Sequence, residues 1–201
     1  MSDNSFAPDA VQGSYQEIHS LQPSKVDNEN NTSALDSSSQ VYGKTGNTIN
    51  KREVQKVVSV YDVANYILSK LGVCTSMKLH KLLYYCQAWS LVWDDTPLFP
   101  QPVEAWANGP VVRDLFALHR GKFDLTPLDI TIGNPNNLSE EQKDTVDHVL
   151  GFYGSRTPQW LIDQTHAERP WQNARKGLAS DERGHSVINL EDMRDYYSSL
   201  Q

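Results

Sequence analysis

The sequence has little that would cross-link it or anchor it in a bilayer. Cys74 and Cys86 are the only cysteines among 201 residues, and they lie on successive apolar segments without metal-ligand spacing. We therefore expect buried free thiols in a reducing compartment. No window approaches the roughly 18 continuous apolar residues of a membrane span. The N-terminus also lacks a charged region followed by an apolar one. These absences favour a cytoplasmic protein.

Positive charge is also scarce. The chain has 18 Lys and Arg residues against 25 Asp and Glu residues, which gives a net charge of −7. Neutralising nucleic-acid phosphates needs a basic patch, and the longest basic cluster (Lys51, Arg52 and Lys56) is interrupted by Glu53. The balance therefore argues against a nucleic-acid partner and would suit a basic protein partner.

Motifs of metal binding and catalysis are missing. There is no Gly-x-Ser-x-Gly elbow and no phosphate loop. The six histidines are scattered, with no two at i, i+4 spacing: His19, His80, His119, His148, His166 and His185. We predict no metal site, no cofactor and no enzymatic activity. The rival interpretation is a small hydrolase with a site near His166 and Glu104.

Composition changes near residue 55. Residues 1–50 are rich in Ser, Asn, Gln and Thr, and all five tryptophans lie beyond residue 88. The first segment buries too little apolar surface to offset an ordering entropy of roughly 1–2 kcal/mol per residue. We therefore predict a disordered polar tail over residues 1–55 and one folded domain over residues 56–201.

The segment from Lys78 to Trp89 predicts a central helix. Ser76 is the expected N-cap, and the helix should run to about Trp93. The apolar residues form two adjacent ridges, too wide a stripe for a lightly docked surface helix: Leu79, Leu83 and Cys86, then Leu82, Tyr85 and Trp89. The part that would be left to contact a partner is the polar side: Lys78, Lys81, Tyr84 and Gln87.

Capping and turn residues predict the remaining elements. The expected helices begin at Ser59 (ending at Gly72), at Pro110, at Ser139 with Gln142, at Thr157-Pro158 (closed or bent by Pro170) and at Asn189. Val103–Ala107 and Leu128–Ile132 alternate like paired strands, and Val187-Ile188 is a candidate third strand. The expected class is mainly α (α+β), a compact single domain of about six helices with a small two- or three-stranded sheet.

Two constellations allow either a structural or a partner-binding role. The segment from Glu104 to Val112 can be a strand that enters a Gly-Pro turn, or it can present an outward tryptophan. The segment from Thr165 to Trp171 can end a helix, or it can form a polar rim around an aromatic anchor. The candidate partner-binding residues are Glu104, Trp106, Asn108, Gly109, Pro110, Val111, His166, Glu168, Arg169 and Trp171.

Four segments in this order resemble the Panacea (SocA-like) antitoxin domain, also described as phage-associated GepA-like. They are Lys78-Leu79-x-Lys81-Leu82-Leu83-Tyr84-Tyr85-x-Gln87-Ala88-Trp89, Pro97-Leu98-Phe99, Glu104-Ala105-Trp106-x-x-Gly109-Pro110-Val111-Val112 and Thr165-His166-x-Glu168-x-Pro170-Trp171. The resemblance covers roughly residues 59–200. Many members carry an additional N-terminal domain, whereas this chain has the polar segment there.

The resemblance implies a non-enzymatic antitoxin of a type II toxin–antitoxin system, of bacterial, prophage or phage origin. Such a protein would neutralise a cognate protein toxin by direct binding. One mode in the family implies a second partner, a AAA+ protease, to which the antitoxin delivers the toxin as an adaptor. The alternative is a phage or prophage protein that binds a host or defence factor.

Overall fold

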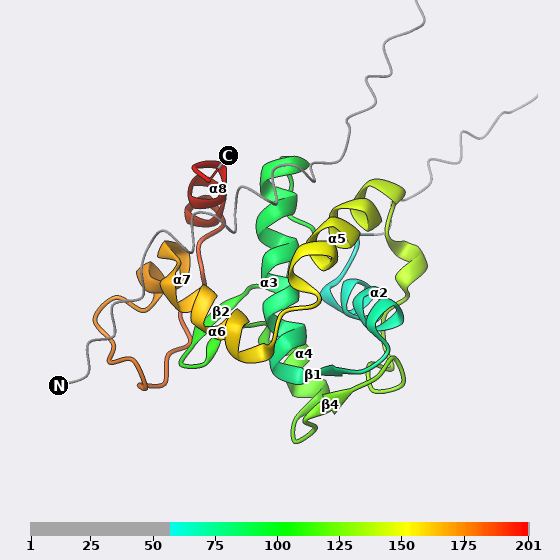
Figure 1. Cartoon of the computed structure of the whole chain (residues 1–201), viewed down its shortest axis with the longest axis horizontal. Helices are drawn as coiled ribbons and strands as arrows, with labels where there is room; N and C mark the ends of the chain where they lie inside the picture. Colours follow the sequence, from blue (N-terminus) through cyan, green and yellow to red (C-terminus); the bar gives the residue numbers. More distant parts are fainter. Residues whose placement is uncertain (1–56, 201) are drawn as a thin grey trace, which may run out of the picture. The chain divides into compact units, whose positions relative to one another are not determined.

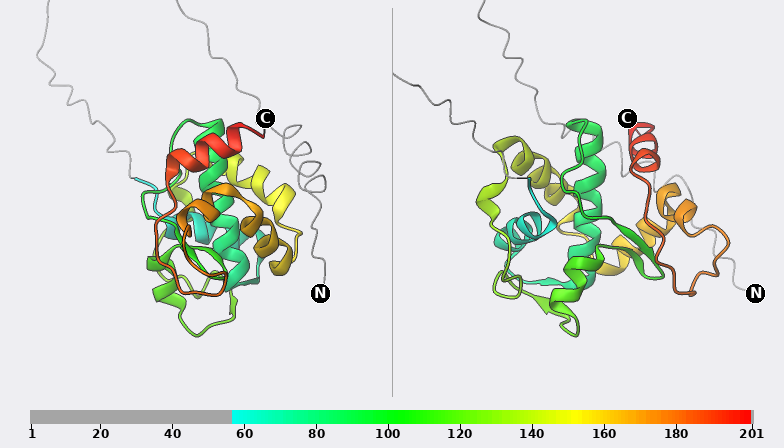
Figure 2. Two further views of the ribbon diagram at one scale, coloured as in Figure 1. Left: turned by 90° about the vertical axis from the view of Figure 1, so that its left-hand side faces the viewer. Right: turned by 180° about the vertical axis from the view of Figure 1, so that it is seen from behind.

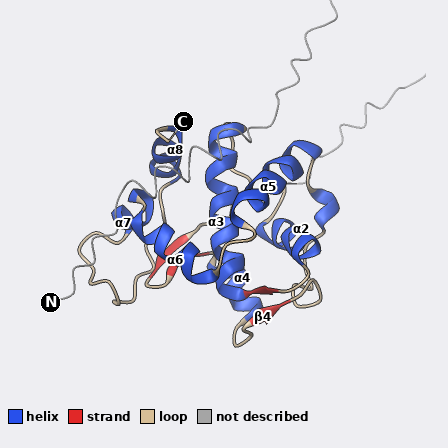
Figure 3. Cartoon of the chain, in the orientation of Figure 1, coloured by secondary structure: helices blue, strands red, loops and turns tan. Residues whose placement is uncertain are grey.

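The computed structural model describes residues 57–200, so the predicted tail over residues 1–55 lies outside the described residues. The described part is mainly helical with short strands, as expected (Figures 1 and 3). Its helices are α2 (Val60–Leu71), α3 (Ser76–Trp93), α4 (Arg113–His119), α5 (Glu140–Tyr153), α6 (Pro158–Ala167), α7 (Arg169–Ala174) and α8 (Leu190–Ser198). Its strands are β1 (Cys74–Thr75), β2 (Glu104–Trp106), β3 (Gly109–Val111) and β4 (Asp124–Leu125), with a 3-10 helix η1 at Pro135–Asn137.

Helix α3 runs through the middle of the fold. Helices α2 and α5 pack on one side of it, and α6 and α8 pack on the other, as the rear view in Figure 2 shows. Every residue from Leu79 to Leu91 is buried. The predicted outward polar side is therefore wrong: Lys81, Tyr84 and Gln87 are each at most 1% exposed. Only Lys78 of that set is partly exposed.

Two buried polar side chains of α3 bind main-chain groups of the segment that follows the helix. Gln87 donates from Nε2 to the carbonyl of Phe99 and accepts from the amide of Phe99, both at 3.1 Å. Ser90 donates to the carbonyl of Thr96 at 2.8 Å. A buried polar group without a partner would cost about 1–3 kcal/mol. These contacts therefore fix the connection between α3 and β2 against the helix.

The predicted helix ends are mostly confirmed. Ser59 and Ser139 each form a capping box, with Asp62 and Gln142 respectively. Gly72 ends α2 with a positive φ of 75°. At α3 the cap is one residue earlier than predicted, because the hydroxyl of Thr75 accepts from the amide of Lys78.

The predicted strand over Val103–Ala107 is confirmed as β2, which pairs antiparallel with β3. The prediction that Pro110 opens a helix is wrong. Gly109, at φ 94°, turns the chain back first, so Pro110 lies in β3 opposite Ala105. Ala105 donates its amide away from β3, to the carbonyl of Ser186, so the ladder needs no N–H from Pro110 at this position.

The predicted strand over Leu128–Ile132 is also wrong. Its place is taken by β4, which pairs with β1 and not with β2. The carboxylate of Asp129 accepts from the amide and the hydroxyl of Thr126, which closes a turn where alternation predicted extended chain. The candidate third strand forms a single antiparallel bridge between Val187 and Glu104.

Pro170 does not close a helix. Helix α6 ends at Ala167, and Glu168 is extended at φ −91° and ψ 136°. Pro170 then lies in the first turn of α7, where its missing N–H would have no helical partner. The result is a sharp corner between α6 and α7, with Glu168 at its apex.

Candidate functional site

The two predicted constellations meet at one place, which we call the junction. It consists of the β2–β3 hairpin (residues 104–111) and the α6–α7 corner (residues 165–171). Trp171 donates from Nε1 to the carbonyl of Trp106 at 3.1 Å. The ring of His166 stacks on Trp171 with 4.1 Å between centroids and an interplanar angle of 17°. Segments about 60 residues apart in sequence therefore share one packed surface.

Lys81 of α3 lies beneath the junction. Its side chain is 1% exposed, and Nζ donates to the carbonyl of Pro110 at 3.2 Å. A Cβ at Gly109 would lie 2.5 Å from Cε of Lys81, so a larger residue would displace the lysine side chain. The positive φ of Gly109 also favours glycine at this position. Burial lowers the pKa of Lys81 to about 7. The amine is therefore only partly protonated near neutral pH.

Glu168 holds the corner against the core. Its carboxylate accepts from the hydroxyl of Tyr85 on α3 at 3.0 Å and from the hydroxyl of Tyr197 on α8 at 2.6 Å. The residue is 0% exposed. Tyr85 in turn stacks on Tyr153 of α5 with 3.8 Å between centroids. Glu168 thus binds α3 and α8 directly, and the stacking of Tyr85 on Tyr153 extends this contact to α5.

Glu104 holds the outward face of the hairpin. It accepts from Nε and Nη2 of Arg113 at 2.7 and 2.8 Å, and from Nε1 of Trp106 at 2.7 Å. Burial raises the pKa of Glu104, but the bonds from Arg113 and Trp106 outweigh burial and leave the pKa below its usual value. Trp106 also meets Phe116 of α4 edge-on at 5.0 Å. Glu104, which is itself paired with Arg113, therefore fixes the orientation of the Trp106 ring.

The structure divides the ten predicted residues into two groups. Six are buried: Glu104, Gly109, Pro110, Val111, Glu168 and Trp171. The other four reach the surface. Trp106 and His166 are partly exposed, and Asn108 and Arg169 are exposed. The buried group forms the framework of the junction, as the structural interpretation expected. Partner contact stays a prediction, and it applies most directly to the four surface residues.

Sequence reasoning missed two buried cations that shape the junction. Lys81 was placed on an outward face. Arg175 was not singled out, yet its guanidinium donates to the carbonyls of Ala105, Ala179, Ser180 and Glu182. Because all four acceptors are main-chain groups, no local sequence pattern could have revealed them.

The structure also pairs two histidines that are 39 residues apart. His80 Nε2 lies 3.1 Å from His119 Nε2, and His80 Nδ1 accepts from the amide of Val112. Burial lowers the pKa of both rings, most strongly for His80. Neutral His80 must then donate from Nε2, so His119 donates from Nδ1 to Ser76 at 3.4 Å. In this arrangement His119 cannot act as a base toward Ser76.

The rival interpretation places a hydrolase site near His166 and Glu104. Burial lowers the pKa of His166, and nearby Lys81 lowers it further. A hollow of about 460 Å³ lies between α2 and residues 127–135, and none of the ten predicted residues lines it. Within residues 57–200, no group of three or more His, Cys, Asp or Glu side chains is placed to hold a metal ion.

The two cysteines are free and buried, as expected. Burial raises the pKa of the Cys74 thiol to about 11 and raises that of Cys86 as well. Neither thiol is therefore activated as a nucleophile. Among the described helices, none combines the length and the apolar character needed to cross a bilayer.

Comparison with known families supports the resemblance found in the sequence. Residues 79–172 match the family model described as "Antitoxin SocA-like, Panacea domain". This part of the chain is similar to a Panacea domain. The matched range includes Lys81, the β2–β3 hairpin and the α6–α7 corner, so the resemblance is confirmed there and is narrower than residues 59–200. Searches of curated proteins and of solved structures gave no match.

The buried amine of Lys81 makes a pH-dependent contribution to the stability of the folded domain. Its pKa is about 7 in the folded state and about 10.4 in the unfolded chain. Between these values the unfolded state binds more protons, so stability rises with pH. In Lys81→Met, the free energy of unfolding relative to wild type should fall by up to about 2 kcal/mol between pH 7 and pH 9. Urea denaturation at both pH values measures this difference.

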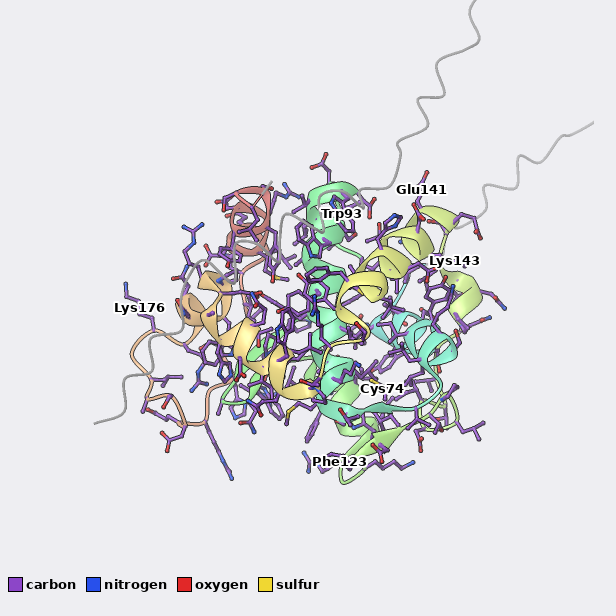
Figure 4. The ribbon with its side chains drawn as sticks, viewed as in Figure 1. Cys74, Trp93, Phe123, Glu141, Lys143 and Lys176 are labelled. Atoms are coloured by element: carbon purple, nitrogen blue, oxygen red, sulfur yellow. The ribbon has the colours of Figure 1, made fainter. Side chains whose placement is uncertain are left out.

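Lys176, exposed beyond α7 (Figure 4), provides the matched control. Lys176→Met should show the same offset from wild type at both pH values. An equally constant offset for Lys81→Met would show that the amine is charged in the folded protein.

Proposed function

We propose that this protein is the antitoxin of a type II toxin–antitoxin pair and neutralises a protein toxin by direct binding. The observation that carries the proposal is the match of residues 79–172 to the SocA-like antitoxin family. The chemistry of the junction supports a binding role. Lys81, Glu104 and Glu168 are each held in structural hydrogen bonds rather than directed into a reaction pocket.

The surface of the junction is the proposed toxin-binding site. Trp106 and His166 are partly exposed there, and Asn108 and Arg169 are exposed. Asn108 makes no side-chain hydrogen bond within the described residues, and Arg169 packs over the ring of Tyr196 at 5.3 Å. Aromatic and arginine side chains on a rigid base are typical of binding hot spots. The buried framework supplies that base.

The toxin–antitoxin relationship is tested with the reading frame next to the gene of this chain. Its product should stop growth when expressed alone, and co-expression of this chain should restore growth and give a complex that co-purifies. A neighbour that is harmless alone, or a toxic neighbour that this chain does not restrain, would contradict the proposal.

The position of the binding surface is tested by charge reversal. Arg169→Glu should weaken toxin binding by about tenfold or more, because it replaces an exposed cation at the proposed contact. Arg194→Glu makes the same change on exposed Arg194 of α8, whose guanidinium donates one hydrogen bond within residues 57–200, to the carbonyl of Asp95. That control should bind within about twofold of wild type. Equal binding by both variants would place the toxin elsewhere.

We further propose that the polar segment over residues 1–55 serves an adaptor role toward a cytosolic AAA+ protease. Its composition supports this role, because a polar segment can engage a second partner without disturbing a folded face. Deleting residues 1–55 should leave toxin binding unchanged and abolish assisted degradation of the toxin. Toxin half-life in the presence of each version measures this effect, and an unchanged half-life would remove the adaptor role.

A further inference from the structure

The small sheet of the junction has two edges that differ in their main-chain groups. At the β3 edge, Pro110 has no N–H, and its carbonyl accepts from Nζ of Lys81 at 3.2 Å. At the opposite edge, residues 186–188 add to β2 through the bond from Ala105 to the carbonyl of Ser186 and the bond from Ile188 to the carbonyl of Val103, both 2.8 Å. The first edge is therefore closed at Pro110.

The second edge is open at Val187. Because Ser186 and Ile188 point their bonded groups toward β2, the N–H and C=O of Val187 point the other way. Neither group has a hydrogen-bond partner within residues 57–200. The side chain of Val187 is 55% exposed, and that of Leu190 just beyond it is 40% exposed.

Proteins usually protect such an edge with Lys, Pro or a covering segment. Among the described residues, this edge leaves a free donor, a free acceptor and an apolar side chain together. The side chain of Val187 lies on the same face as Glu104 and Trp106. On that face, the ring of His185 meets Trp106 edge-on at 5.5 Å. The open edge is therefore continuous with the proposed toxin-binding surface.

We propose that an extended segment of the toxin adds to this edge as a further strand. One residue of that segment would donate its N–H to the carbonyl of Val187 and accept the N–H of Val187. A β-branched or aromatic side chain on that residue would pack against Val187. The strand order would become toxin segment, residues 186–188, β2 and β3. This inference rests on the proposed antitoxin function and specifies how the partner is held.

Amide exchange of the full chain, free and in complex with the neighbouring gene product, tests the inference. The Val187 amide should exchange freely in the free protein and at least tenfold more slowly in the complex. A complex that forms without protecting this amide would overturn the strand addition and leave the antitoxin function standing. A neighbour that does not bind at all would overturn both. Protection already present in the free protein, together with a dimeric mass, would assign the edge to a second copy of the chain.

Substitutions give an independent measurement. Val187→Pro removes the donor and should raise the Kd for the toxin by about tenfold, the effect of one or two main-chain hydrogen bonds. Val187→Thr keeps the donor and should stay within about threefold. Leu128→Thr, at a side chain that is 88% exposed on a distant loop, should have no effect. Equal Kd values for all three variants would overturn the proposal, and thermal melting of each variant verifies that it is folded.

Discussion

The enclosure of α3 is the constraint on which the rest of the fold depends. Because every residue from Leu79 to Leu91 is buried, each polar side chain on this helix must find its partner inside the protein. Gln87 binds the connection to β2, Lys81 binds the β2–β3 hairpin, and Tyr85 binds the α6–α7 corner. Polar contacts from this central helix therefore position three segments that are distant in sequence.

Local signals allowed much of the fold to be predicted. Ser59, Ser139 and Gly72 act through groups within a few residues, so helix ends could be found from the sequence. The errors arose where distant contacts decide. Leu128–Ile132 alternates like a strand, yet Asp129 folds it into a turn. The polar side of α3 was predicted to face solvent, because the periodicity of one helix cannot show that other helices pack on both of its sides.

The two candidate segments meet in the structure, but the sequence could not show which of their residues are buried and which are exposed. Glu168 and Trp171 looked like a rim and an anchor, and both are buried. Their partners, Tyr197 and the carbonyl of Trp106, lie 29 and 65 residues away. Arg175 has only main-chain acceptors, which no pattern of residue types reports.

The junction has a hydrogen-bonded interior and an exposed surface that depend on different residues. Lys81 and Glu168 are tied to the scaffold by buried hydrogen bonds, and Glu104 by a partly buried ion pair with Arg113, so replacing them would disturb folding. The side chains of Asn108 and Arg169 form none of the hydrogen bonds that hold Lys81, Glu104 and Glu168 in place. Substitutions at such exposed positions can accumulate at little cost in stability. Under the proposed antitoxin function, a few surface changes could therefore alter which partner is bound while the interior stays the same.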